Sequence, residues 1–496
     1  MSIFNCARSH LNLPSVVKFN VTLLKSLYSS SVYDLSSLNS SVVPKESDSC
    51  KLPQLTIHEA LKCKLSEKLS LKGWIRSHRR LKEHHFMTLN DGLSPKNIQI
   101  VVPTILLERK GVKPQFGSSI CCKGSLVESR GPEQPLELYC EDIDIIGQCN
   151  VLEYPFNPNT SKNNNWNGMR EHIHLRPRAS RYASLMRLRS DLNFEIHNLM
   201  KESGYFNVTT PILTKNECEG GSKPFSVKPI DYPDDVSFFK GKAKLTVSAQ
   251  LHLETAACAL SRVYTLGPTF RAEVNKSRRH LSEFTMFELE EAFIDDLDVL
   301  MDKVEFIVKS LASKLIDGQN ENYLDVLKST KYDLTYRLLG RYIRLTYDDA
   351  IEIINKKQDV QPAEFGKDLS AFHETVLLEY FEHQPLFITH FPSEIRPFYM
   401  KSDGDRALCF DLLGAVGGEI CGGSLREDNY DKLKSRMDEV EGLTEELDWY
   451  LDLRKYGNVP HGGCGFGFDR LIQTITGLSN IKDVVPYPRF LYHCPL

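Results

Sequence analysis

Short apolar runs separated by glycine and proline fill the segment from residue 52 to about 150. Five strands are expected there: Leu71–Ile75, Phe86–Leu89, Asn97–Val102, Ser119–Val127 and Leu136–Ile146. Runs of this length, with polar and apolar positions alternating near their ends and turn residues between them, are typical of strands. Five strands with few helices predict a small Greek-key barrel such as an OB-fold.

A helical period begins after a polar stretch at residues 151–180 that is rich in Asn and Pro. Leucine and isoleucine recur at spacings of three and four, at Leu185, Leu188, Leu192, Ile196 and Leu199. Gly204 follows where such a helix would end. The next segment, Phe206–Leu213, alternates but contains Pro211, which predicts an edge strand.

The remaining pattern mixes long helices with short strands in no regular alternation. Helices are expected at Leu251–Leu260 and Leu297–Leu315, and strands at Tyr264–Phe270, Phe284–Leu289, Leu386–His390 and Cys409–Leu413. Irregular mixing favours an α+β domain built on an antiparallel sheet over a doubly wound one. The predicted organisation is therefore a leader at 1–50, a barrel at 51–150, a linker at 151–178 and an α+β domain at 179–496.

The leader differs from the rest of the chain in composition. It is rich in serine, carries Arg8, Lys18 and Lys25, and has its first acidic residue at Asp34. This composition is that of a mitochondrial transit peptide and predicts delivery to the mitochondrial matrix. A disordered tail without an address is the alternative.

The amino-acid composition excludes few classes of function. The chain of 496 residues has a net charge of −4, so no global basic field marks a nucleic-acid binder, although a local basic face would suffice. The thirteen cysteines include no C-x-x-C pair, which favours reduced thiols over a zinc site or disulfides. No apolar run approaches the ~20 residues that cross a bilayer.

Two arginine-containing elements carry the strongest chemical signal. Between the two strands that flank it, the segment Phe270–Phe284 forms a cationic loop in which Arg271, Arg279 and His280 suit a triphosphate. About 200 residues later, Gly463–Phe468 alternates glycine with larger residues and leads to Arg470 at the start of a helix. Glycines in a strand allow close approach, and a helix N-terminus favours phosphate. A solvated charged hairpin is the alternative for the first element alone.

Together these segments resemble class II aminoacyl-tRNA synthetases of the subgroup that handles Asp, Asn and Lys. The Arg271 hairpin resembles motif 2 of that family, Gly465–Arg470 resembles motif 3, and the helix and strand ending at Pro211 resemble motif 1. The resemblance implies a six-stranded antiparallel sheet with flanking helices, preceded by an OB-fold that binds the anticodon. It also implies a homodimer with motif 1, around Pro211, at the interface.

The resemblance assigns roles in ATP binding. Arg271 is expected to bind the α-phosphate and the amino-acid carboxylate, Phe284 to stack on adenine, and Arg470 to hold the γ-phosphate. Asp411 and Glu419 match the family's Mg²⁺ pair, and hard carboxylate oxygens suit that ion. The full set expected around ATP is Arg271, Glu273, Arg279, His280, Leu281, Phe284, Glu419, Gly467, Asp469 and Arg470.

Amino-acid choice is expected to depend on Glu219, Gln250, Leu253, Glu254 and Arg426. Glu219 matches the position that binds the α-ammonium, and Arg426 the arginine that reads the side-chain oxygen. Aspartyl relatives place Lys where this chain has Leu253, so an aspartate carboxylate there would lose a cationic partner. Glu254 is expected to accept from an asparagine amide and to repel aspartate.

The residues of several longer stretches, such as Phe391–Met400 and Asp452–Gly457, resemble those of the asparaginyl, organellar members of this family. In the barrel, Arg79, Phe86 and Gln99 match positions that contact the anticodon, and Phe86 as a core residue is the alternative. The expected activity is ATP- and Mg²⁺-dependent ligation of asparagine to tRNA(Asn). An aspartyl enzyme, possibly charging both tRNAs, and a non-catalytic RNA-binding paralogue are the alternatives.

Overall fold

The computed structural model describes residues 52–129, 131, 134–157, 165–216, 223–231, 238–239, 241–275, 277–317, 326 and 337–496. The predicted leader at 1–50 and the predicted α-ammonium ligand Glu219 lie outside these residues. None of the described helices has the length and apolar character needed to span a membrane. All described cysteines are free thiols, as their spacing predicts.

The N-terminal part is a closed barrel with the strand order β1-β2-β3-β5-β4. All five predicted strands are present: β1 (Lys68–Arg80), β2 (His84–Asn90), β3 (Ile98–Pro103), β4 (Ser119–Glu128) and β5 (Leu136–Gly147). Two short helices were not predicted, α2 (Ile57–Ala60) and α3 (Thr104–Lys110). Alternate residues such as Met87, Leu89 and Ile100 fill the interior, and this is the predicted OB-fold.

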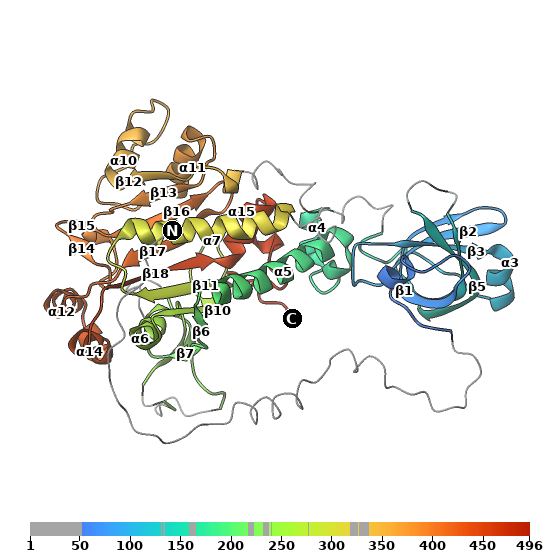
Figure 1. Ribbon diagram of the computed structural model, residues 1–496, viewed down its shortest axis with the longest axis horizontal. Coiled ribbons are helices and arrows are strands. Elements are labelled where there is room, and N and C mark those ends of the chain that lie inside the picture. Colours follow the sequence, from blue (N-terminus) through green and yellow to red (C-terminus); the bar gives the residue numbers. More distant parts are fainter. Residues whose placement is uncertain are drawn as a thin grey trace, which may run out of the picture. The chain divides into compact units, whose positions relative to one another are not determined.

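The C-terminal part is built on an eight-stranded sheet with the order β12-β13-β16-β17-β18-β11-β10-β6 (Figure 1). The strands are β6 (Phe206–Asn207), β10 (Arg262–Phe270), β11 (Glu283–Ala292), β12 (Ile343–Thr346), β13 (Leu386–Thr389), β16 (Cys409–Gly414), β17 (Gly418–Leu425) and β18 (His461–Gly467). The six central strands, from β13 to β10, are antiparallel as expected. The two edge strands β12 and β6 pair parallel to their neighbours and were not part of that expectation.

Three long or amphipathic helices share one hydrophobic core with this sheet: α5 (Ser180–Glu202), α7 (Leu297–Asp317) and α15 (Phe468–Thr476). In α5 the predicted stripe is buried at Leu185, Leu188, Leu192 and Ile196, and the chain turns at Gly204 with φ +80°. Figure 1 shows α7 running across the sheet. This packing fixes the strand ends on which the site residues lie.

The smaller elements are α4 (Trp166–Glu171), α6 (Gln250–Leu260), α10 (Tyr347–Asn355), α11 (Ala371–Tyr380), α12 (Tyr430–Asp438), α13 (Leu443–Glu446), α14 (Asp448–Lys455), β7 (Leu213–Thr214), β8 (Ser226–Val227), β9 (Ala243–Leu245), β14 (Ser402–Asp403) and β15 (Arg406–Ala407), with 3₁₀ turns at Arg176–Arg178, Ser393–Ile395 and Ile481–Asp483. The single edge strand predicted over Phe206–Leu213 is wrong. β6 joins the main sheet, whereas β7 pairs with β9 in a separate small sheet. Pro211 lies between them and has no N–H for a continuous ladder.

Candidate active site

The predicted cationic hairpin is present, with β10 and β11 paired along their whole length from Arg262↔Glu291 to Phe270↔Glu283. Arg271 directly follows β10, and its backbone N–H donates to the Ser282 carbonyl over 3.0 Å. Its guanidinium carbon lies 5.5 Å from the centre of the Phe284 ring on the opposite strand. A guanidinium held over an aromatic ring is preorganised to grip an anion with its planar fork.

A cavity of about 240 Å³ lies against this hairpin. Every residue predicted to surround ATP lines it: Arg271, Glu273, Arg279, His280, Leu281, Phe284, Glu419, Gly467, Asp469 and Arg470. The sequence elements that supply them are about 200 residues apart, and the β11–β18 pairing brings them together. Burial, assisted by the charge of Arg470, lowers the pKa of His280, so its ring is a neutral donor or acceptor here.

Two of the cations that line this cavity are held by oxygen atoms of neighbouring residues. Arg279 Nη1 donates to Glu374 Oε2 over 2.7 Å, and Arg470 Nη1 donates to the Glu419 carbonyl over 2.7 Å. Burial raises the pKa of Glu374 to about 7, against the opposing charge of Arg279. Both arginines therefore have a resting partner that an incoming polyphosphate would compete with.

Asp469 lines the nucleotide cavity but also has a structural role. It is buried, accepts from Arg189 on α5, and accepts from the Thr285 backbone N–H over 2.9 Å. These two bonds tie the start of α15 to α5 and β11. The carboxylate thus sets the position of Arg470 while it lines the cavity.

Asp411 and Glu419, the predicted metal pair, lie on the adjacent strands β16 and β17. Both carboxylates face the position of Gly422, where a Cβ would lie 3.0 Å from Glu419 Oε1 and 3.7 Å from Asp411 Oδ1. Asp411 Oδ2 accepts from Arg396 Nη2 over 2.6 Å. Burial, partly offset by Arg396, raises the pKa of Asp411 to about 6. Two carboxylates converging where no side chain intrudes fit a hard divalent cation.

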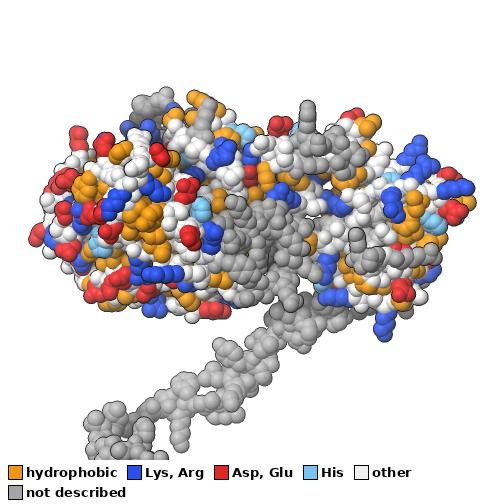
Figure 2. Space-filling view, turned by 90° about the horizontal axis from the view of Figure 1, so that it is seen from above, with side chains coloured by type: hydrophobic (Ala, Val, Ile, Leu, Met, Phe, Trp, Pro, Cys, Tyr) orange, Lys and Arg blue, Asp and Glu red, His pale blue; other side chains and the backbone are white. Residues whose placement is uncertain are grey.

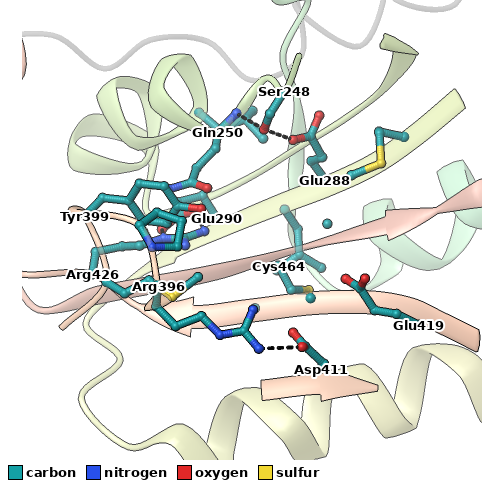
Figure 3. Close-up of a pocket in the computed structure, with 18 of the residues that line it drawn as sticks. Ser248, Gln250, Glu288, Glu290, Arg396, Tyr399, Asp411, Glu419, Arg426 and Cys464 are labelled. Atoms are coloured by element: carbon teal, nitrogen blue, oxygen red, sulfur yellow. Dashed lines mark hydrogen bonds and ion pairs between the residues drawn. The ribbon is translucent and has the colours of Figure 1, made fainter. Parts of the chain in front are cut away.

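A larger cavity of about 530 Å³ adjoins the first and shares Arg271, Glu273 and Glu419 with it. Figure 3 shows Asp411 and Glu419 toward one end of this cavity, and Tyr399, Arg426 and Glu290 at the other. Gln250, Ser248 and Glu288 close a third side (Figure 3). The two cavities form one cleft with Arg271 between them.

A buried ion pair forms the closed end of the larger cavity. Arg426 Nε donates to Glu290 Oε1 over 3.0 Å and its Nη2 to Oε2 over 2.9 Å, while Nη1 donates to Ser424 Oγ over 2.7 Å. The two side chains are 4% and 1% exposed. Gly463 makes room for the pair, because a Cβ there would lie 2.0 Å from Glu290 Oε2. Gly463 of β18 thus leaves space for the Glu290 carboxylate, which belongs to the protein itself and not to a ligand.

Glu254 lies behind this pair, fully buried. Its carboxylate accepts from Tyr450 Oη over 2.6 Å and from Arg454 Nη2 over 3.1 Å, and lies 3.0 Å from His461 Nε2. Burial alone would raise the pKa of Glu254, but the His461 hydrogen bond and the Arg454 charge outweigh it and hold the pKa below its usual value. The predicted direct contact with a substrate amide does not fit this position, because the protein's own donors surround the carboxylate.

Glu254, Glu290 and His461 are close enough together to hold a metal ion. Arg426 and Arg454 already occupy the carboxylate oxygens, however. Two guanidinium groups in contact with two carboxylates neutralise the charge that would attract a cation. The cluster is therefore an internal ion network.

Leu253 and Gln250 lie on the first turns of α6 and both line the larger cavity, as predicted. Leu253 is fully buried, packs with Ala249 and Ala257, and brings no charge to this side of the cavity. Gln250 Nε2 donates to Glu254 Oε1 over 3.1 Å. The side-chain oxygen of Gln250 can therefore accept a hydrogen bond from a ligand in the cavity.

Among the polar side chains that line this cavity, the sequence reasoning missed Ser248, Glu288, Glu290, Asp368, Arg396 and Tyr399. Glu288 accepts from the Ala249 backbone N–H over 3.1 Å, and burial raises its pKa. The spacing of Glu288 and Glu290 places both on one face of β11, and acids at alternate positions in a strand otherwise rich in apolar residues were an available signal.

On the barrel, Arg79, Phe86 and Gln99 lie on neighbouring strands. Arg79 pairs in register with Phe86, its guanidinium carbon 5.4 Å from the ring centre, and Gln99 pairs with Thr88. Met87 points into the core, whereas Phe86 is on the outer face and half-buried. Phe86 is therefore not a core residue. Acidic and basic side chains are intermixed on the face shown in Figure 2, consistent with a small net charge.

Comparison with known proteins agrees with this geometry. The family described as tRNA synthetases class II (D, K and N) matches residues 167–491, and the OB-fold nucleic acid binding domain matches residues 69–146. The chain is 39% identical over 469 residues to asparaginyl-tRNA synthetase of Mus musculus, covering 90% of this chain and 96% of that protein. It is 38% identical over 444 residues to a probable mitochondrial asparagine–tRNA ligase of Dictyostelium discoideum, covering 87% and 94%.

Among solved structures, the asparaginyl-tRNA synthetase of Pyrococcus horikoshii complexed with asparaginyl-adenylate superimposes with a TM-score of 0.79 at 31% identity. The match covers 90% of this chain and all of that one. The fold, the paired Arg271 and Arg470 elements and these similarities lead to one conclusion. The chain belongs to the class II aminoacyl-tRNA synthetases, in the family that serves Asp, Lys and Asn.

Proposed function

We propose that this protein is an asparagine–tRNA ligase, which activates L-asparagine with ATP and transfers it to tRNA(Asn). The observation that carries the proposal is the closed end of the larger cavity, where the Arg426–Glu290 pair stands beside the neutral Leu253. An amide side chain has both an acceptor and donors and matches such a pair, whereas a carboxylate has only acceptors. Aspartate would bring a second negative charge to Glu290 without a further cation to balance it.

In the first step, the asparagine carboxylate attacks the α-phosphorus of ATP, forming asparaginyl-adenylate as the bond to diphosphate breaks. Arg271 stands where the two cavities meet and stabilises the charge that develops on the α-phosphate. Arg279 and Arg470 leave Glu374 and the Glu419 carbonyl to bind the outer phosphates. No side chain needs to accept a proton, because the nucleophile is already a carboxylate.

In the second step, a hydroxyl of the terminal ribose of the tRNA attacks the adenylate carbonyl and AMP leaves. Glu288 and the oxygen of the oriented Gln250 amide receive the α-ammonium group throughout. Glu219, outside the described residues, is proposed as a further ligand of that group. These contacts hold the carbonyl in one place for both reactions.

Asp411 and Glu419 would hold Mg²⁺, with Gly422 leaving the space between them open. When bound, the ion neutralises phosphate charge. Arg396, which pairs with Asp411 and also lines the cleft, would be available to the carboxylate of the amino-acid substrate.

The test of the proposed function is ATP–pyrophosphate exchange dependent on Asn, Asp or Lys, each assayed separately. Asparagine should give the highest kcat/KM, by a factor of at least about 100. Faster exchange with aspartate would make this an aspartyl enzyme. No exchange with any of the three, with intact tRNA binding, would make it a non-catalytic RNA-binding paralogue.

The barrel is proposed to bind the anticodon through Arg79, Phe86 and Gln99 on its outer face. Stacking on Phe86 is worth ~1–3 kcal/mol for one base. Phe86→Ala should therefore raise the KM for tRNA by about 5- to 100-fold and leave pyrophosphate exchange unchanged. Met87→Ala, on the core side of the same strand, is the control for loss of folding. Equal losses of Phe86→Ala in both assays would assign Phe86 a structural role.

A homodimer through the motif 1 region is proposed from the apolar side chains exposed around the open sheet edge. Phe206 on β6 is 58% exposed, and Ile212 and Leu213 are 43% and 46% exposed. Sedimentation should give twice the chain mass, and Ile212→Asp should give the monomer. A monomeric wild type would reject this interface.

Delivery to the mitochondrial matrix is proposed from the composition of residues 1–50 together with the mitochondrial relative from Dictyostelium discoideum. A fusion of these residues to a fluorescent reporter should co-localise with mitochondria. A diffuse signal would contradict it.

A further inference from the structure

Behind the larger cavity lies a buried polar cluster that has no part in the reaction as described. It consists of Glu254 on α6, Tyr450 and Arg454 on α14, and His461 at the start of β18. All four are at most 6% exposed, so none contacts solvent to any extent. Four polar groups in a core are costly unless each is paired.

Glu254 is the centre of the cluster. Oε2 faces the Tyr450 hydroxyl, Arg454 Nη2 and His461 Nε2 within 2.6 to 3.1 Å, and Oε1 accepts from Gln250 Nε2 over 3.1 Å. His461 Nδ1 lies 2.8 Å from the Val459 carbonyl, which only accepts. Both ring nitrogens of His461 therefore face oxygen atoms of the protein.

Besides the approach of Glu254 Oε1 to Arg426 Nε at 3.9 Å, two hydrogen-bonded lines of contact lead from this cluster to the cavity. The first is the Gln250 amide, whose NH₂ group is held by Glu254 so that its oxygen is left for the substrate. The second is the backbone on both sides of the Arg426 side chain. The Arg426 N–H donates to the His461 carbonyl over 2.9 Å, and Arg454 Nε donates to the Glu427 carbonyl over 2.9 Å.

A contribution to folding stability does not explain why these four polar side chains are buried together. Arg454 Nη1 is buried with no hydrogen-bond partner among the described residues, and such an atom costs free energy. An apolar replacement of a buried ion network is often neutral or stabilising. What the cluster does supply is a fixed direction for two groups that line the cavity.

We propose that Tyr450, Arg454 and His461 are positioning residues for the amino-acid substrate, acting through Glu254 on Gln250 and through the backbone on Arg426. The inference rests on the proposed function for the identity of that substrate. It adds that α14, a helix outside the cavity lining, determines the affinity for the amino acid without affecting that for ATP.

The experiment is pyrophosphate exchange with Tyr450→Phe, Arg454→Met, Arg454→Lys and His461→Gln in the full-length protein. Tyr450→Phe should raise the KM for asparagine by about 3- to 10-fold and Arg454→Met by at least about 10-fold. The KM for ATP should stay within about twofold in both. Arg454→Lys keeps the charge and should recover part of the loss, and His461→Gln, which keeps one donor, should fall between wild type and Arg454→Met.

Asp452→Asn is the matched control, because Asp452 lies on the same helix and pairs only with Lys455 at the surface over 3.1 Å. It should behave as wild type. Equal rises in the two KM values, or none in either, would overturn the proposal. Should Arg454→Met fail to fold, Tyr450→Phe and His461→Gln decide the question alone. If the wild-type enzyme prefers aspartate, the proposed function is rejected. A rise in the KM for aspartate in the variants, with the KM for ATP unchanged, would then still support the positioning role.

Discussion

The two halves of the cleft are built differently. In the amino-acid half, Glu254, Glu290 and Arg426 are at most 4% exposed, and each charge has a fixed partner inside the protein. In the nucleotide half, the side chains of Arg279 and Arg470 are 23% and 24% exposed. Arg279 contacts the Glu374 carboxylate, and Arg470 contacts the carbonyl of Glu419.

The difference follows from what each half must recognise. Asparagine differs from aspartate by one donor group, and only donors and acceptors fixed in advance can reject the wrong partner strongly. A triphosphate offers several charged oxygens, so cations with moderate freedom can bind it at small cost. Selectivity thus depends on a rigid buried network, and ATP binding on exchangeable ion pairs.

The largest effect is expected where the halves meet. Arg271→Ala removes the one guanidinium that lines both cavities, so exchange should fall by about 10² to 10³ in kcat. The folding transition should change little, because the side chain lies at the wall of an open cleft, over the Phe284 ring. Retention of adenylate synthesis would contradict the role given to Arg271.

The next effect should be largest in the amino-acid half. Gly463→Ala places a Cβ 2.0 Å from Glu290 Oε2 and 2.3 Å from the Leu289 carbonyl, so the carboxylate must leave Arg426 and the backbone of β11 must shift as well. Breaking a buried pair costs ~3 kcal/mol or more, so kcat/KM for asparagine should fall at least about 100-fold. Gly267→Ala is the control, since a Cβ there meets nothing within 4 Å. An equal loss of ATP affinity would show that the halves are not independent.

A smaller effect should come from the nucleotide half and depend on pH. Burial raises the pKa of Glu374 to about 7, so the fold favours the protonated form. That contribution to stability is fully present below the ordinary value of 4.5 and is lost as the pH rises through about 7. Glu374→Gln should gain stability relative to wild type between pH 5 and 8, on the order of 1–2 kcal/mol.

Thermal unfolding of the ligand-free enzyme at pH 5, 6, 7 and 8 measures this gain. Parallel curves for the two proteins would show that Glu374 does not titrate in this range. Glu254, whose pKa is held below its usual value, should add no slope above pH 5. A Glu374 that titrates near neutral pH beside a Glu254 that stays ionised would sharpen the contrast between these two carboxylates.

Local pattern was enough to predict most of the fold. The five barrel strands and the β10–β11 hairpin are visible in the sequence because each combines alternation with clear turn residues. The edge strand β12 and the parallel pairing of β6 were not visible, because two to four paired residues carry too little pattern. The break at Pro211 was noted, but whether the two sides join one sheet or two depends on distant partners.

The candidate site was predicted unevenly for a similar reason. The residues around the nucleotide cavity occur in compact motifs, and all of them line it. The amino-acid half combines single residues from α6, β11, β17 and the segment around Tyr399, and Glu290 has no local signal of its partner Arg426. Glu254 was chosen from its neighbours in the chain, and only the packing of α14 reveals that its carboxylate is surrounded by the protein's own donors and does not line the cavity.

The central claim is that a neutral, prebuilt pocket selects asparagine. The direct measurement is the ratio of kcat/KM for asparagine to that for aspartate, in wild type and in Leu253→Lys. Leu253 lines the cavity beside Arg426 and Glu290, so an ammonium there would compensate an aspartate carboxylate. The account predicts a wild-type ratio well above one that falls by at least about tenfold in Leu253→Lys. A wild-type ratio below one, or a ratio that the substitution leaves unchanged, would contradict it.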